Sequence, residues 1–101
     1  MKETEIIVRN LSGFLQFLRS KFTIIHNSNF FFRDLHYGVM AYLADLGTRK
    51  GYSESEKIAR EVAGALETAG YFTKIDYQSW CVNYPEFALP RAEKSAPAAK
   101  Q

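Results

Sequence analysis

Apolar residues recur at intervals of three and four along much of the chain, the spacing that gathers side chains on one face of a helix. The first run consists of Ile7, Leu11, Phe14, Leu15, Leu18 and Phe22 and indicates a helix over roughly residues 4 to 21. The second covers residues 30 to 46, and its small or polar face consists of Asp34, Gly38, Ala41 and Asp45. The third covers residues 53 to 69, and its inward face consists of Ile58, Val62, Ala65, Leu66 and Ala69. The periodicity therefore predicts three helices.

Two other stretches have the character of strands. Residues 22 to 26, Phe-Thr-Ile-Ile-His, have the β-branched content of a short strand, and the polar turn residues 26–29 follow it. From Tyr71 to Tyr84 bulky and polar residues alternate, which predicts two strands paired as a hairpin around Tyr77 and Gln78. Pro85 should end the second of these strands.

Local chemistry marks both ends of the third helix. Residues 53–56, Ser-Glu-Ser-Glu, match a capping box, in which Ser53 and Glu56 satisfy each other's free backbone amides. Gly70 stands where a left-handed residue closes a helix, and Tyr71 then falls where it can pack back on Leu66, as in a Schellman closure. The sequence thus predicts a helix that turns sharply into the hairpin.

Composition indicates one folded domain. The chain has 101 residues, 47% of them hydrophobic and 15% aromatic, enough for a single bulky core. Residues 88–101 hold almost no bulky apolar groups, so we expect a domain over residues 1–87 and a flexible tail over 88–101. The net charge of +2 keeps the protein soluble and lacks the strong basic excess of many nucleic-acid binders.

Nothing in the sequence names a catalytic chemistry. Cys81 is the only cysteine, which excludes an internal disulfide and favours a reducing, cytoplasmic setting. His26 and His36 lie on different predicted elements, too few for a metal site, which needs three or four ligands. The charged start and the lack of a long apolar run exclude membrane insertion. We expect no enzyme activity, no catalytic residue, no metal and no cofactor.

The predicted order of helix, strand, helix, helix, strand, strand resembles the winged-helix domains, an α+β fold with a small antiparallel sheet. The resemblance covers residues 5 to 87 and includes the phrase Leu-Glu-Thr-Ala-Gly-Tyr-Phe-Thr-Lys-Ile at 66–75. Winged helices most often bind DNA, with the third helix in the major groove and the wing on the backbone. This implies contacts with double-stranded DNA by Arg49, Lys50, Lys57, Arg60 and Lys74.

The third helix also carries four glutamates against two basic residues, which disfavours contact with phosphate. Within the same superfamily the chain resembles the DEP domains, which dock proteins or membrane surfaces. The residues that carry this likeness are Phe32, Val39, Tyr42, Leu43, Glu56, Ala59, Leu66, Gly70 and Tyr71.

Three consecutive phenylalanines at 30–32 spread over roughly 200° of a helix and cannot all face one core. We therefore expect one of the three to pack on the N-terminal helix or on a partner chain. Phe30 and Phe31 are the candidates for such a partner interface, for example that of a homodimer. DNA association comes first among our hypotheses, and the alternatives are a docking module that binds a protein or a membrane surface and an oligomeric structural subunit.

Overall fold

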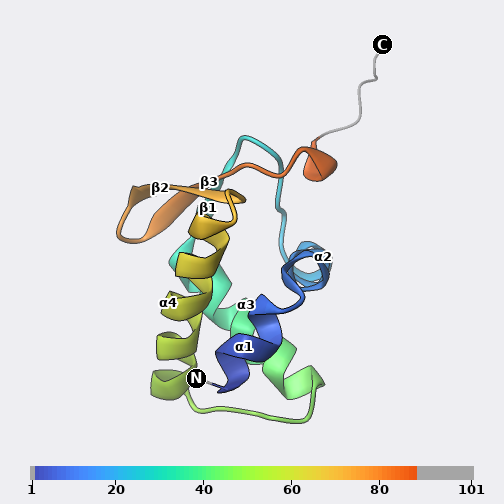
Figure 1. Ribbon diagram of the computed structural model, residues 1–101, viewed down its shortest axis with the longest axis vertical. Coiled ribbons are helices and arrows are strands. Elements are labelled where there is room, and N and C mark those ends of the chain that lie inside the picture. The colour runs from blue at the N-terminus through green and yellow to red at the C-terminus, as the bar shows by residue number, and fades with distance from the viewer. Residues whose placement is uncertain (1, 89–101) are drawn as a thin grey trace.

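The computed structural model describes residues 2–88, which form an α+β fold of helices beneath a small antiparallel sheet (Figure 1). The helices are α1 Lys2–Val8, α2 Leu11–Lys21, α3 Phe32–Asp45 and α4 Tyr52–Thr68. The strands are β1 Asn29–Phe31, β2 Phe72–Asp76 and β3 Ser79–Val82, and a 3-10 turn, η1, covers Pro85–Phe87. The predicted order of elements is confirmed if α1 and α2 are taken as two halves of the first helix.

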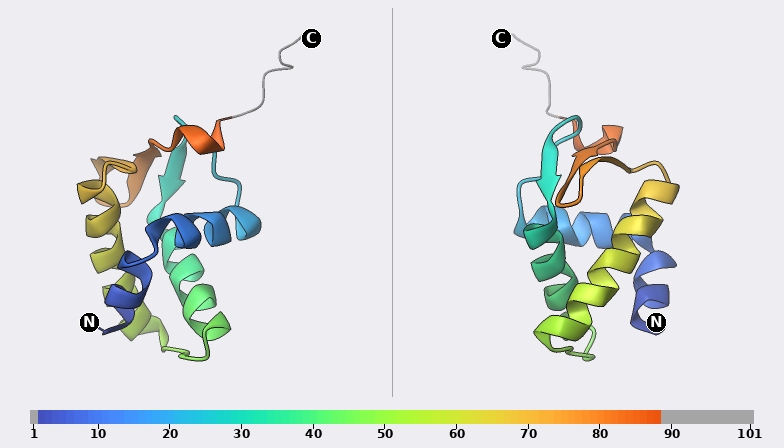
Figure 2. Two further views of the ribbon diagram at one scale, coloured as in Figure 1. Left: turned by 45° about the vertical axis from the view of Figure 1, so that its right-hand side comes forward. Right: turned by 90° about the vertical axis from the view of Figure 1, so that its left-hand side faces the viewer.

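The sheet covers one end of α3 and α4, as the two turned views show (Figure 2). β3 lies in the middle and pairs antiparallel with β1 and β2. Phe30 stands opposite Trp80, and Phe72 stands opposite Val82, so these four side chains share the inner face. All four are buried against the helices. The predicted hairpin around Tyr77 and Gln78 is confirmed.

The prediction of one continuous first helix is wrong, because the chain breaks between Val8 and Leu11. The Asn10 side chain accepts a hydrogen bond from the Gly13 amide at 3.3 Å and so caps α2. The break lets α1 pack against α4 while α2 packs against α3. Ile7, in the last turn of α1, is fully buried.

The predicted strand at residues 22–26 is also wrong, because this segment is irregular. Ile24 is buried as a single anchor, and Asn27 takes a left-handed conformation with φ of 69°. The Asn27 amide then donates to the Val82 carbonyl at 2.7 Å, which brings the following residues alongside β3. The edge strand therefore forms at Asn29–Phe31, seven residues later than its β-branched content suggested.

Helix α3 is buried on two sides rather than one. The predicted polar or small face includes Gly38, which is itself buried. A Cβ on Gly38 would lie 2.1 Å from the Leu18 Cδ2 atom, so the glycine allows α2 to approach α3 closely. Because Phe30 and Phe31 lie in β1, the helix begins at Phe32.

The two ends of α4 had opposite outcomes. The capping box is wrong: the helix begins at Tyr52, and its N-cap residue Gly51 makes no side-chain hydrogen bond. The closure at Gly70 is confirmed, with φ of 84° and the Tyr71 amide donating to the Leu66 carbonyl at 3.0 Å.

The C-terminal part of the described chain returns to the core. Phe87 is buried and lies 4.6 Å from Tyr84 between ring centroids, and the Tyr84 amide donates to His26 Nδ1 at 3.0 Å. The Gln16 side chain donates to Glu86 at 2.9 Å, which ties η1 to α2. The folded part thus extends to η1. Of the flexible tail predicted for 88–101, all but Ala88 lies outside the described residues.

Candidate interaction surfaces

Arg60, predicted to contact DNA, is held inside the protein's own structure. Its guanidinium lies between the rings of Phe32 and Tyr77, 3.7 Å from each ring centroid. It also donates to the Tyr77 carbonyl at 2.7 Å, and more weakly to the Gln78 side chain at 3.5 Å. We call this group the hairpin clamp, because it fastens the tip of the hairpin to α3 and α4.

Lys50, a second predicted DNA contact, is neutralised by acidic neighbours. Its ammonium lies 3.1 Å from the Glu3 carboxylate and 3.8 Å from that of Glu54. A backbone hydrogen bond and the Lys50 ammonium lower the pKa of Glu3, and the hydrogen bond to Glu3 raises the pKa of Lys50. Lys50 therefore links α1 to the loop of residues 46–51.

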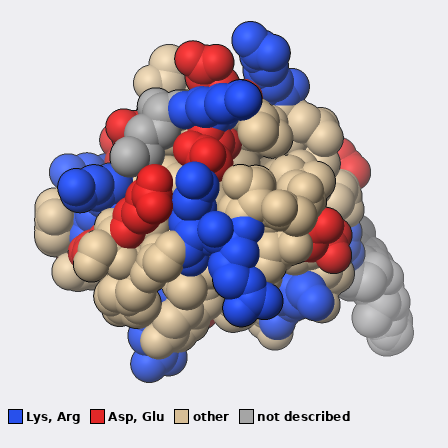
Figure 3. All heavy atoms as spheres, turned by 90° about the horizontal axis from the view of Figure 1, so that it is seen from below, with Lys and Arg blue, Asp and Glu red and all other residues tan. Residues whose placement is uncertain are grey.

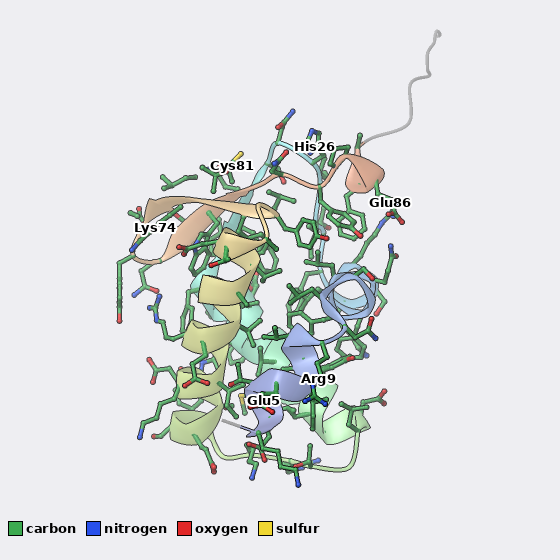
Figure 4. All side chains as sticks on the ribbon, in the orientation of Figure 1. Glu5, Arg9, His26, Lys74, Cys81 and Glu86 are labelled. Atoms are coloured by element: carbon green, nitrogen blue, oxygen red, sulfur yellow. The ribbon has the colours of Figure 1, made fainter. Side chains whose placement is uncertain are left out.

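The other three predicted contacts, Arg49, Lys57 and Lys74, are exposed but scattered. Arg49 lies in the 46–51 loop, and Lys74 lies on the hairpin at the opposite end of the molecule (Figure 4). Helix α4 stands between them and is about 25 Å long at the usual rise per residue. The structure does not gather the predicted cations into one site.

The charge around the 46–51 loop is mixed. Figure 3, which looks at the loop from below, shows acidic side chains interspersed among the basic ones. Residues 2–88 contain ten Lys and Arg and ten Asp and Glu, so their formal net charge is zero. Such a surface produces no strong field of one sign to attract a polyanion.

The two phenylalanines predicted at a partner interface differ. Phe30 is 2% exposed and packs between Phe22 and Phe72, so this prediction is wrong for Phe30 in the described structure. Phe31 is 53% exposed and alternates with Phe30, so it lies on the outer face of the sheet. Cys81 and Thr73 share that face, and Figure 4 shows Cys81 pointing away from the helices.

A buried serine and histidine, which the sequence did not reveal as a pair, lie at the start of α4, where no side chain caps the helix. The Ser55 hydroxyl donates to the Gly51 carbonyl at 2.6 Å and lies 3.1 Å from His36 Nε2. His36 Nε2 also lies 3.0 Å from the Tyr52 carbonyl. Ser55 is 0% and His36 2% exposed, so no substrate reaches them, and the pair joins the start of α4 to α3. The only sequence signal was a polar residue on the apolar side of each helix.

A groove of about 360 Å³ lies between α3 and the 46–51 loop. We call it the α3 groove, and its lining residues are Tyr37, Met40, Ala41, Ala44, Arg49 and Lys50. The first four follow one another at helical spacing along a face of α3, and Tyr37 is 46% exposed. The groove is thus an apolar stripe of a helix with two cationic residues at its border.

A second groove, of about 270 Å³, lies between the 22–25 segment and η1. The Arg19 guanidinium covers the Phe87 ring at 4.9 Å and forms part of its wall. The chain leaves the described structure beside this groove, since Ala88 is among its lining residues.

Within residues 2–88 no helix has the length and apolar character that a membrane crossing requires. The same residues bring no three His, Cys, Asp or Glu side chains together in an arrangement that could hold a metal ion.

The class that fold and surface define is thus an α+β domain with a three-stranded antiparallel sheet and an apolar groove along α3. No protein-family model, curated protein or solved structure matches the chain.

Proposed function

We propose that the chain is a non-catalytic, winged-helix-like docking module that binds a partner protein through the α3 groove. The observation that carries this proposal is the groove itself: within residues 2–88, an apolar stripe of α3 lines an open groove beside the exposed cation Arg49. Exposed apolar surface bordered by polar residues is typical of protein interaction sites. The order of elements supports the winged-helix likeness.

The disposition of the charges supports docking to a protein over binding to DNA. Arg60 is engaged in the hairpin clamp, and Lys50 is paired with Glu3 and Glu54. Helix α4, which would enter the major groove, has two basic residues against four glutamates. Phosphate binding depends on Lys and Arg that are free to replace counterions.

DNA association is a second candidate, and the observation that favours it is the exposure of Arg49, Lys57 and Lys74. None of these three makes an ion pair within the described part of the chain. A titration with duplex DNA at two salt concentrations tests this candidate, because each phosphate contact steepens the loss of affinity with added salt.

Two matched glutamate variants test the docking proposal. Ala44→Glu places a charged side chain in the groove, and Thr73→Glu places the same side chain on the exposed outer face of the sheet. A partner is first obtained by affinity capture with the tagged protein and then purified. Its affinity for each variant is measured by calorimetry.

We expect Ala44→Glu to weaken binding at least tenfold and Thr73→Glu to leave it unchanged. Equal binding by both variants would exclude the groove. A loss confined to Thr73→Glu would instead assign docking to the sheet face that bears Phe31 and Cys81. Self-association of the protein that Ala44→Glu abolishes would identify the partner as a second copy, as in a structural subunit.

A further inference from the structure

We infer that the occupant of the α3 groove is an amphipathic helix of a partner protein, with an apolar face toward α3 and a carboxylate toward Arg49. This inference rests on the proposed docking function and specifies the chemistry of the partner. Shape and charge support it separately.

The small residues of the groove suit a second helix. Ala41 and Ala44 are consecutive positions of the stripe, and the larger Tyr37 and Met40 stand on the same stretch of α3. Two helices pack with their axes about 8–10 Å apart, and small side chains at the contact allow the shorter distance. The stripe from Tyr37 to Ala44 is about 10 Å long at the usual rise, which matches about two turns of a bound helix.

The apolar character of the stripe decides which side chains face it. An amphipathic helix binds such a groove through residues spaced at i, i+3 or i+4, and i+7. Burial of these residues supplies most of the affinity, since an ion pair at an exposed site contributes little. The ion pair with Arg49 therefore determines the orientation of the partner helix more than its affinity.

The charge at the border of the groove favours an acidic group on the partner. Lys50 already contacts the carboxylates of Glu3 and Glu54, so its charge is balanced. Arg49 is exposed and makes no ion pair within residues 2–88. A guanidinium can bind a carboxylate through two parallel hydrogen bonds, which fixes direction as well as position. A helix with an aspartate or glutamate near one end satisfies Arg49.

Two other occupants fit less well. A membrane surface attracts clusters of four or more cations, whereas the groove has one cation outside an ion pair. An added β-strand needs an open sheet edge, and the groove lies along a helix, away from β1 and β2. The edge of β2 is also interrupted by a bulge between Lys74 and Asp76.

The test is a selection of displayed peptides on the full chain. The library holds random peptides of about 15 residues, long enough for four helical turns. Each round removes peptides that also bind the Ala44→Glu variant, so that survivors depend on the groove. The enriched peptides are then synthesised, and their dissociation constants are measured by fluorescence anisotropy with the wild type, Arg49→Glu and Thr73→Glu.

We expect enriched peptides with apolar residues at helical spacing and at least one aspartate or glutamate at a constant offset from them. Arg49→Glu should weaken their binding about fivefold to twentyfold, because an ion pair of up to about 1 kcal/mol becomes a repulsion. Replacement of the peptide's acid by lysine should weaken binding to the wild type and restore binding to Arg49→Glu. Thr73→Glu should bind like the wild type.

The outcomes separate this inference from the docking proposal. Peptides that depend on the groove but lack an acid, or that bind Arg49→Glu as well as the wild type, would overturn the inference and leave the docking function standing. Failure to enrich any groove-dependent peptide would overturn both. Binding to phosphatidylserine vesicles that Arg49→Glu abolishes, with no enriched peptide, would assign the groove to a lipid surface instead.

Discussion

The hairpin clamp gives the sharpest test of the structure, because it assigns Arg60 to folding stability. Arg60→Ala removes two cation–π contacts, each with a ring centroid 3.7 Å from the guanidinium, and a hydrogen bond of 2.7 Å to the Tyr77 carbonyl. A cation–π contact contributes about 0.5–1 kcal/mol at an exposed site and about 2 kcal/mol when desolvated. A hydrogen bond from a charged donor contributes about 1.5–3 kcal/mol.

These contributions must be reduced on the open side of the clamp. Tyr77 is 64% exposed, so its contact with Arg60 belongs at the low end of the range, whereas Phe32 is buried and its contact belongs near the middle. With the hydrogen bond also taken at its low end, Arg60→Ala should lower the free energy of unfolding by about 3 kcal/mol. Arg60→Lys keeps the charge but loses the flat stacking surface, so we expect a loss of about 1–2 kcal/mol.

Urea unfolding followed by the fluorescence of Trp80, the only tryptophan, measures both effects. Tyr77→Ala and the double variant Arg60→Ala/Tyr77→Ala complete a cycle, for which we expect a coupling of about 0.5–1 kcal/mol, the size of an exposed cation–π contact. If Arg60 were a solvent-exposed residue that only binds DNA, its removal would change the free energy of unfolding by less than about 0.5 kcal/mol, as most surface substitutions do. A loss that small in Arg60→Ala, or no coupling to Tyr77, would refute the clamp.

Two further predictions concern the helical glycines Gly64 and Gly38 and the carboxylate of Asp76. Gly64 faces open space, so Gly64→Ala should stabilise α4 by about 1 kcal/mol. In Gly38→Ala the clash with buried Leu18 should cost about 1–3 kcal/mol, which offsets the gain in helix propensity and leaves a net loss or no gain. The urea midpoints of the two variants test this difference, and equal stabilisation in both would contradict the close approach of α2 and α3. Hydrogen bonds from the Gln78 amide and the Ser79 hydroxyl lower the pKa of Asp76, so its contribution to stability is present above the ordinary carboxyl pKa of about 3.9 and is lost as pH falls through the lower folded-state value. Asp76→Asn should therefore lose less stability than the wild type between about pH 5 and pH 2, and parallel pH profiles of the urea midpoint would count against it.

The features that the sequence predicted correctly depend on the chemistry of one or two residues. Gly70 has a positive φ, which other residues rarely adopt, so a glycine after an apolar helical pattern marks its closure. The alternation on both sides of Tyr77 and Gln78 likewise specifies two strands that can pair with only a short turn between them. Neither prediction needs knowledge of what lies across the core.

The features that sequence reasoning missed depend on contacts between distant segments of the chain. Ser53 and Glu56 fit a capping box, but Ser55 turns inward to Gly51 and His36, and the N-cap residue is Gly51, two residues before Ser53. The edge strand forms where β3 provides a partner rather than where β-branched residues are most frequent. In both places tertiary packing outweighs local preference.

The candidate sites show the same limit. The sequence identified Arg60 and Lys50 as cations. It could not show that Arg60 would stack between aromatic rings or that Lys50 would form ion pairs with carboxylates. The α3 groove was equally hidden, because its apolar stripe and Arg49 come from two segments whose distance depends on the turn after α3. That turn is closed by Gly47, with φ of 83°.

Arg49 belongs to both functional hypotheses, so its loss alone cannot distinguish them. A DNA surface responds to charge at long range, and Ala44→Glu and Thr73→Glu change the net charge equally. The affinity of a partner for the α3 groove depends on the shape of the groove, and only Ala44→Glu places a larger side chain there. DNA binding therefore predicts similar losses in the two variants, each larger at low salt, whereas protein docking predicts a loss in Ala44→Glu that persists when salt is raised, because the penalty is steric.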